Sequence, residues 1–177
     1  MSRLSRSMVK AIREHIPTFR ELDHKKVSGE LTFEESDRWS VLSGGLTRLF
    51  RPDGARLSEE RSFFRIPYRV AVSGMTGRTS FQVLSYDLSS GGIATKHLAD
   101  VRPGQLVRLT FELTLRGFLG MTKKHVFTIP ATCQWSSPKS KRTGFSFVDA
   151  SSEQRAQLHR LTMEIIECRA KQALKTC

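Results

Sequence analysis

The chain has 177 residues and a formal net charge of +12, with 29 Lys and Arg against 17 Asp and Glu. This length allows one domain with a sizeable core plus an appendage. No apolar run approaches the roughly 20 residues that span a bilayer, and no signal-peptide pattern follows the basic N-terminus. Three widely spaced cysteines and five scattered histidines fit neither a disulfide framework nor a metal site. A membrane span, secretion, a metal and a cofactor are therefore not expected, whereas a cytoplasmic location is.

The first 55 residues are predicted to be a helical extension. Apolar residues recur at steps of three and four through residues 8–22, and Pro17 is expected to bend or interrupt that helix. Thr32 followed by Glu35 is a capping box that predicts the start of a second helix. The turn residues at 52–54 predict its end. Helical-period apolar residues usually form packing surface, so this extension is predicted to pack rather than to bind a ligand.

From residue 65 onward the pattern changes to short segments rich in Val, Ile, Phe and Thr, separated by Gly, Pro and Ser. Residues 106–115 alternate apolar and polar side chains, which is typical of a strand with one buried face. Pro67 and Pro130 are expected to restrict two strands to edge or bulged positions. The pattern predicts an antiparallel barrel or sandwich, with strands at residues 66–72, 79–86, 92–96, 106–115, 125–135 and 143–148.

A final helix is predicted to begin at Ser151, because Gln154 completes a second capping signal. Its apolar stripe, which includes Leu158 and Leu161, is expected to close one end of the barrel or to contact a partner. The predicted domain organisation is a helical extension at residues 1–55, a mainly β domain at 56–150, and a C-terminal helix at 151–177 that packs on the barrel or projects from it.

Positive charge is concentrated in the predicted β domain. Residues 61–150 hold 13 basic and 4 acidic side chains, which gives +9 of the total +12. An even spread of charge would indicate only a soluble basic surface. A concentration in one segment indicates a field that attracts phosphate groups.

Two clusters in this segment supply groups that a guanine nucleotide needs. Arg61 and Arg65 are four residues apart and offer two planar guanidinium groups, which can pair with phosphate and with the O6 and N7 acceptors of guanine. Asp87 can accept hydrogen bonds from the ring and exocyclic N–H donors of guanine, and Ser89 adds a hydroxyl.

Glycine completes the second cluster. Gly91 and Gly92 are expected to allow positive φ and close approach of the backbone to a ligand. Taken alone, the arginine pair is a frequent match in an arginine-rich chain, and the second cluster is equally consistent with a tight turn.

Together, in this order and between strands, the clusters resemble the paired RxxxR and D/N-x-S-x-x-G signatures of the PilZ domain family. The resemblance covers residues 56–168. It implies a six-stranded antiparallel β-barrel that binds cyclic di-GMP, a bacterial second messenger, and then changes its contacts with another domain or a protein partner. The ligand-binding residues would be Arg61, Arg65, Asp87, Ser89 and Gly92, with Gly91 and Arg69 as supplementary contacts. Separately from the resemblance, the sequence shows no nucleophile and base pair, metal cluster or paired carboxylates of conventional spacing, so the chain is not expected to be an enzyme.

The resemblance also bears on stoichiometry and on signal transmission. Family members that bind two stacked ligands tend to carry a basic residue before the first arginine, but Glu59 and Glu60 stand here. Acidic groups repel a dianionic ligand, so one ligand copy is expected. Because the arginines lie where the helical region joins the barrel, ligand binding is expected to reposition the extension or a protein partner.

Two other functions are consistent with parts of the sequence. A basic β-barrel can bind nucleic acid, but the aromatic residues fall in strands where core burial is the simpler account, so nucleic acid is the less favoured ligand. A PilZ-like adaptor that does not bind ligand is the other alternative, and the intact motifs count against it.

Overall fold

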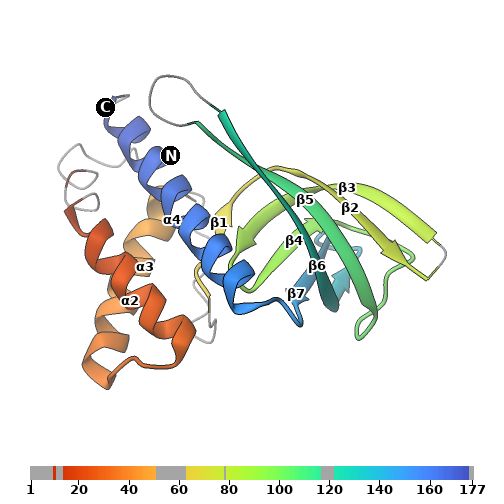
Figure 1. Cartoon of the computed structure of the whole chain (residues 1–177), viewed down its shortest axis with the longest axis horizontal. Coiled ribbons are helices and arrows are strands. Elements are labelled where there is room, and N and C mark those ends of the chain that lie inside the picture. The colour runs from red at the N-terminus through yellow and green to blue at the C-terminus, as the bar shows by residue number, and fades with distance from the viewer. Residues whose placement is uncertain (1–9, 11–13, 51–62, 78, 117–121, 176–177) are drawn as a thin grey trace. The chain divides into compact units, whose positions relative to one another are not determined.

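The computed structural model describes residues 10, 14–50, 63–77, 79–116 and 122–175 (Figure 1). Arg61, the acidic pair before it, the predicted turn at residues 52–54 and most of residues 8–13 therefore lie outside the described residues. The elements in chain order are α2 (Ile16–Ser28), α3 (Phe33–Phe50), β1 (Ile66–Pro67), β2 (Ala71–Thr76), β3 (Thr79–Ser89), β4 (Gly92–Lys96), β5 (Leu106–Arg116), β6 (Thr122–Ser137), β7 (Arg142–Phe147) and α4 (Ser152–Lys175).

The chain divides into two compact units, and each is described by itself. One unit comprises residues 1–66 with 162–177, and the other comprises residues 67–161. Helix α4 contributes its first part to the second unit and its remainder to the first.

Residues 67–161 form a closed antiparallel β-barrel. Its strand order is β3-β2-β5-β6-β7-β4, and pairing of β3 with β4 closes the ring. The short strand β1 is an addition beside β3. The predicted fold class is confirmed: a mainly β protein with a six-stranded antiparallel barrel, N-terminal helices and a C-terminal helix.

The barrel core follows from the alternation seen in the sequence. In β5, Val107, Leu109, Phe111 and Leu113 are all buried, whereas the residues between them are more exposed. Phe111 stacks on Phe127 and Phe147, with ring centroids 5.5 and 5.8 Å away. Two residues of α4, Leu158 and Leu161, belong to the same core. These two side chains of the C-terminal helix therefore pack into the barrel core.

Strand β6 differs from the expectation for Pro130. This strand lies between β5 and β7, so its proline is not on an edge strand. Pro130 pairs in register with Arg108 of β5, and its carbonyl accepts a hydrogen bond from Val148 just after β7 ends. The proline is tolerated because it stands where the ladder with β7 finishes, so the missing N–H interrupts no continuous ladder on that side.

The first unit contains α2, α3 and the last part of α4. Pro17 was expected to bend or interrupt a helix at residues 8–22. Glu14 is helical, His15 is a turn residue, and α2 begins at Ile16 with Pro17 in its first turn, so the helical region is interrupted just before the proline, and α2 then runs on to Ser28. A proline is favourable there because the first N–H groups of a helix have no intrahelical partner. Gly29 ends α2 with φ of +78°, a left-handed conformation that favours glycine.

Both predicted capping boxes are present. The Thr32 amide donates to Glu35 Oε2 at 3.0 Å, and the Glu35 amide donates to Thr32 Oγ1 at 3.3 Å. At α4, Ser151 and Gln154 exchange the same pair of bonds at 3.1 Å each. These reciprocal bonds satisfy N–H groups that the helices leave free, which is why the helices begin at these residues.

Aromatic side chains form the core of the helical unit. Phe19 of α2 stacks on Trp39 of α3 with ring centroids 6.3 Å apart, and it meets Phe64 edge-on at 5.1 Å. Trp39 Nε1 donates a hydrogen bond to the buried carboxylate of Asp23 at 2.9 Å. Arg20 of α2 forms an ion pair with Glu167 of α4. None of the described helices has the length and apolar character needed to cross a membrane.

Candidate functional site

The second predicted cluster forms the hairpin between β3 and β4. Ser89 pairs with Gly92, which leaves Ser90 and Gly91 as the turn. Ser89 Oγ donates a hydrogen bond to the Gly92 carbonyl at 3.2 Å. Asp87 and Ser89 are both buried, with 5% and 1% of their surface exposed. The structure therefore brings together the carboxylate, the hydroxyl and the glycines that the sequence singled out.

A bulge in β3 determines which way these side chains face. The register with β4 shifts between Ser85 and Asp87, so Tyr86 is the extra residue. Leu88 belongs to the barrel core, and its neighbours Asp87 and Ser89 therefore face the outer side of the barrel wall. Without the bulge, the alternation that puts Ser85 on the same side as the core residues would place Asp87 there too.

The glycines serve a different purpose from the one expected. Neither Gly91 nor Gly92 has positive φ. A Cβ on Gly92 would instead lie 2.3 Å from the carbonyl oxygen of Phe145 in β7. The Gly91 carbonyl accepts a hydrogen bond from the Phe147 amide at 2.9 Å. The expectation of positive φ was wrong, and the Gly92 position is explained by the close approach of β7.

The first predicted cluster is described only in part. Arg61 lies outside the described residues. Arg65 is half-buried and immediately precedes β1, between Phe64 and Ile66, which are 5% and 0% exposed. Because Phe64 packs on Phe19, the backbone next to Arg65 is held by the core of the helical unit.

Sequence reasoning missed an aromatic residue with two cations beside the hairpin. The guanidinium carbon of Arg142 lies 4.5 Å from the centre of the Tyr86 ring, and that of Arg69 lies 5.9 Å from the same centre. Arg142 comes from β7, where it pairs with Lys96 of β4. Tyr86 could have been noticed as an aromatic next to Asp87, but only the barrel topology brings Arg142 to it.

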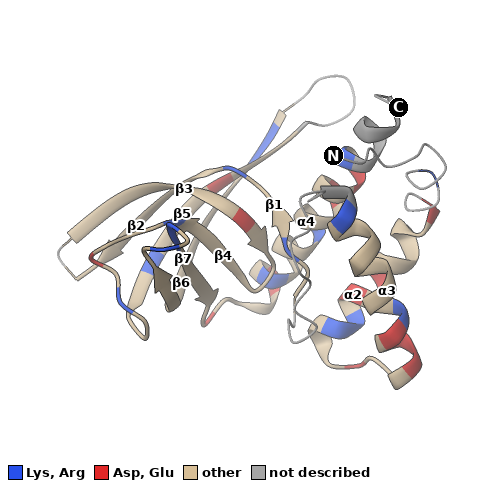
Figure 2. Ribbon diagram, turned by 180° about the vertical axis from the view of Figure 1, so that it is seen from behind, with Lys and Arg blue, Asp and Glu red and all other residues tan. Residues whose placement is uncertain are grey.

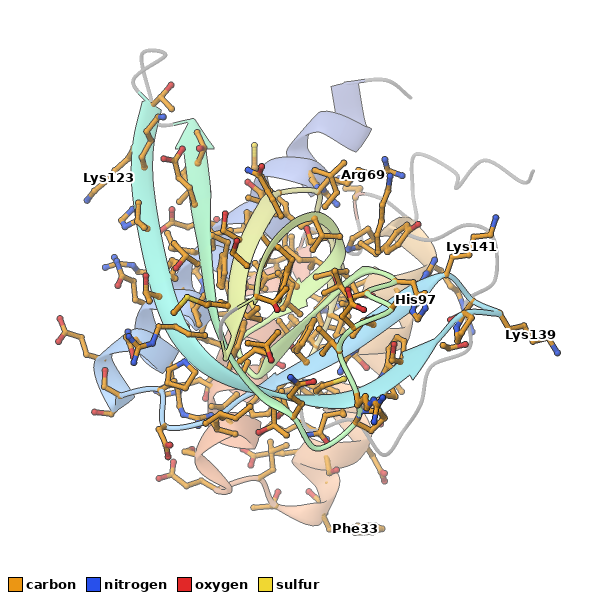
Figure 3. All side chains as sticks on the ribbon, turned by 90° about the vertical axis from the view of Figure 1, so that its right-hand side faces the viewer. Phe33, Arg69, His97, Lys123, Lys139 and Lys141 are labelled. Carbon is orange, nitrogen blue, oxygen red and sulfur yellow. The ribbon has the colours of Figure 1, made fainter. Side chains whose placement is uncertain are left out.

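Basic residues dominate this part of the barrel. Figure 2 shows few acidic residues on the strands, whereas α2 and α3 carry both signs. In Figure 3, Arg69 and Lys141 lie at one side of the barrel and Lys123 lies at another. Among the described residues, no carboxylate forms an ion pair with Arg69, Lys96 or Arg142. The site is suited to an anionic ligand that also presents N–H donors to a carboxylate.

Two other features bear on metal binding and on thiol chemistry. No group of three His, Cys, Asp or Glu side chains among the described residues could hold a metal ion. Burial raises the pKa of the Cys133 thiol, so this cysteine stays protonated and is a poor nucleophile.

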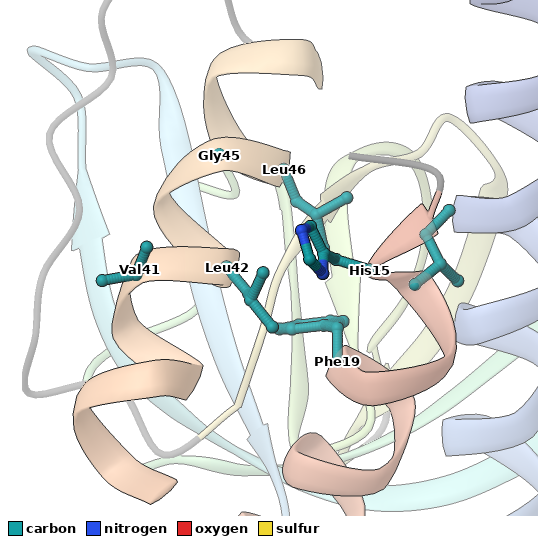
Figure 4. A pocket seen from close by; sticks show the side chains of 7 residues that line it. His15, Phe19, Val41, Leu42, Gly45 and Leu46 are labelled. Carbon is teal, nitrogen blue, oxygen red and sulfur yellow. The ribbon is translucent and has the colours of Figure 1, made fainter. Parts of the chain in front are cut away.

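The helical unit contains a separate apolar pocket of about 180 Å³. His15, which directly precedes α2, and Phe19 of α2 face Leu42 and Leu46 of α3 across it (Figure 4). None of the predicted site residues lines this pocket. The candidate site is therefore the outer face of the barrel at the β3–β4 hairpin.

The closed six-stranded barrel with this hairpin defines the class of protein. The chain belongs to the PilZ domain family, because the model of that domain matches residues 59–164. The resemblance seen in the motifs is thereby confirmed. PilZ domains are ligand-binding adaptors rather than enzymes. No curated protein sequence matches the chain.

Several solved structures are similar to this chain, and the first of them, with a TM-score above 0.5, shares the fold. YcgR from Escherichia coli in complex with c-di-GMP matches with 22% identity and a TM-score of 0.52, over 67% of this chain and 51% of that one. The PilZ domain of the same protein with c-di-GMP matches with 19% identity and a TM-score of 0.47, over 64% of this chain and 95% of that one. The Bacillus subtilis inhibitor of motility MotI/DgrA matches with 22% identity and a TM-score of 0.45, over 59% of this chain and 49% of that one. The chain thus spans about half the length of YcgR and MotI/DgrA.

Proposed function

We propose that this protein is a receptor for cyclic di-GMP and binds it through Arg61, Arg65, Asp87, Ser89 and Gly92. The observation that carries the proposal is the placement of Asp87 and Ser89 on one outer face of the barrel, beside cations that no described carboxylate balances. Membership of the PilZ family and the fold shared with YcgR, which was solved with this ligand, support it.

The chemistry of the residues matches the ligand. The Asp87 carboxylate accepts two N–H bonds from the edge of guanine, a set of donors that adenine does not present together. Ser89 already donates its hydroxyl hydrogen to the Gly92 carbonyl, so its oxygen is left to accept a bond from the ligand. The two motif arginines would pair with phosphate and guanine acceptors. Arg69 and Gly91 would be supplementary contacts.

Arg65, the described motif arginine, belongs to the helical unit, and it lies one residue before β1 begins. Arg65 adjoins Phe64, which packs against Phe19 of α2. Pulling Arg65 onto a ligand would therefore strain the core of the helical unit. We propose that the signal passes to the helices, and through them to a protein partner, by this connection.

A calorimetric titration with cyclic di-GMP tests the binding proposal. Wild type is expected to bind saturably, and Asp87→Ala and Arg61→Ala are expected to lose at least tenfold in affinity, which corresponds to about 1.4 kcal/mol. Asp100→Ala and Arg102→Ala are matched controls, because both residues are exposed and lie away from the hairpin. Absence of saturable binding by wild type would overturn the proposal.

The same titration addresses stoichiometry and the alternative ligands. One cyclic di-GMP per chain is expected because Glu59 and Glu60 precede Arg61. Binding to oligonucleotides that falls steeply with salt, without any response to cyclic di-GMP, would favour a nucleic-acid-binding barrel instead. An adaptor that has lost the ligand would bind neither.

A further inference from the structure

Tyr86 is placed at the surface of the candidate site by the bulge in β3. Its neighbour Asp87 is 5% exposed, whereas Tyr86 itself is half-exposed. The guanidinium carbon of Arg142 lies 4.5 Å from the centre of the Tyr86 ring, and that of Arg69 lies 5.9 Å from it. One aromatic ring thus holds two cations next to the carboxylate that the proposed function assigns to guanine.

The position of Arg142 is fixed by the barrel wall around it. The next residue, Thr143, is fully buried, and its Oγ1 accepts a hydrogen bond from the Leu98 amide at 3.0 Å. Phe145 and Phe147 point into the core, so Arg142 and Gly144 project outward by strand alternation. Arg142 therefore extends outward from the first residue of β7, directly after the turn at residues 138–141.

Two small buried residues and an aromatic ring lie next to Arg142 in the barrel wall. Ala94 pairs with Gly144, and the Trp135 ring lies so close to Gly144 that a Cβ there would be 2.3 Å from it. Lys96, which pairs with Arg142, is exposed. A guanidinium that lies against an aromatic ring on one side has a second face on which another planar group can stack.

Charge supports a ligand role rather than a purely structural one. No described carboxylate forms an ion pair with Arg142, Arg69 or Lys96. The Arg142 guanidinium carbon lies 4.5 Å from the centre of the Tyr86 ring, and this contact limits the positions that the guanidinium can take. A pre-oriented guanidinium loses less conformational freedom when a base stacks on it than a free one does.

We propose that Arg142, held against Tyr86, stacks on a guanine base of cyclic di-GMP while the neighbouring Asp87 accepts hydrogen bonds from the edge of that base. The inference rests on the proposed function, and it adds a specificity-determining pair outside the two motifs. Arg69 supports the arrangement from the other cation position on the same ring.

Substitution by lysine distinguishes base stacking from phosphate binding. Lysine keeps the positive charge but has no planar group, so it can replace arginine at a phosphate far better than under a base. Stacking on a base contributes an amount that corresponds to about tenfold in affinity or more. Arg142→Lys is therefore expected to bind cyclic di-GMP about tenfold more weakly than wild type, close to Arg142→Ala.

The experiment is a set of calorimetric titrations of the full chain with cyclic di-GMP, each variant being first checked for a native circular dichroism spectrum. Tyr86→Phe keeps the ring and is expected to bind as wild type does, whereas Tyr86→Leu is expected to bind about tenfold more weakly. Lys139→Ala is the matched control, since it removes an exposed cation from the loop between β6 and β7.

Each result bears on a different claim. Wild-type affinity in Arg142→Lys with weak binding in Arg142→Ala would assign Arg142 to a phosphate and overturn base stacking. Wild-type affinity in both Arg142→Lys and Arg142→Ala would overturn any ligand role for Arg142 and leave the proposed function standing. Lack of binding by wild type would overturn the proposed function and this inference together. If the Arg142 variants fail to fold, wild-type affinity in Tyr86→Leu would overturn the proposal that Arg142, held against Tyr86, stacks on a guanine base.

Discussion

Gly92 lies directly against the carbonyl oxygen of Phe145, to which a Cβ at that position would be only 2.3 Å away. The glycine of the second motif is therefore needed for the packing of β4 against β7, whatever else it does. A substitution there changes the barrel before it changes any ligand contact. Binding losses at Gly92 must accordingly be compared with losses of stability.

Gly92→Ala is expected to destabilise the barrel by about 1–3 kcal/mol, because two backbone segments must separate. Gly144→Ala is the matched comparison. Its added Cβ meets the Trp135 ring, a side chain that is 37% exposed and can move. Urea denaturation of both variants measures the difference in free energy of unfolding. An equal or larger loss in Gly144→Ala would contradict the assignment of Gly92 to a backbone constraint.

The contact between α2 and α3 is expected to weaken in acid. The Lys25 ammonium lies 2.5 Å from Glu35, and its hydrogen bond is the main cause that lowers the pKa of the Glu35 carboxyl, helped by the Thr32 amide. A carboxyl whose folded pKa lies below its unfolded value contributes stability above the unfolded value of 4.5 and loses it as pH falls through the folded pKa.

Glu35→Gln is expected to reduce this pH dependence below pH 4.5 while keeping the capping hydrogen bonds. Unfolding midpoints followed by circular dichroism between neutral and acid pH provide the measurement. Glu34→Gln is the control, because Glu34 lies in the same first turn of α3 but forms no ion pair with any described lysine or arginine. An unchanged acid dependence in Glu35→Gln would show that other carboxyls govern it.

Trp39→Phe is expected to destabilise the helical unit by about 1–3 kcal/mol. The change retains most of the ring but removes the N–H that donates to the buried Asp23 carboxylate at 2.9 Å. Trp135→Phe serves as the control, since that ring is partly exposed and belongs to the barrel unit. Thermal unfolding of the two variants measures the loss of stability that each substitution causes. A larger loss in Trp135→Phe would argue against a stabilising role for the buried hydrogen bond.

Hydrogen exchange of residues 40–66 is expected to change when cyclic di-GMP saturates the protein. The physical reason is the proposed pull on Arg65, whose neighbour Phe64 packs on Phe19. Phe64→Leu roughly conserves volume but removes the edge-on ring contact, so it should keep the affinity and reduce the exchange response. Unchanged protection in wild type under saturating ligand would rule out transmission through this segment.

Much of the architecture could be predicted from local patterns. The capping boxes at Thr32 and Ser151 and the alternation in β5 depend on neighbours within a few residues, so they appear in the sequence as they do in the structure. Pro17 stands where the helical region is interrupted, as expected, but Pro130 was misjudged. The cost of a proline in a strand depends on which hydrogen bond its N–H would have made, and that depends on where the neighbouring strand ends.

The sequence by itself determined the family, the barrel class and the residues proposed to bind the ligand, because two short motifs and a strand pattern are local properties of the chain. The three-part division at residues 1–55, 56–150 and 151–177 stays a proposal. Tertiary structure alone decided that a bulge turns Asp87 outward, that β7 requires glycine at position 92, and that Arg142 meets Tyr86. These relationships arise from pairing between strands far apart in sequence, where register and twist, rather than residue spacing, determine which side chains meet.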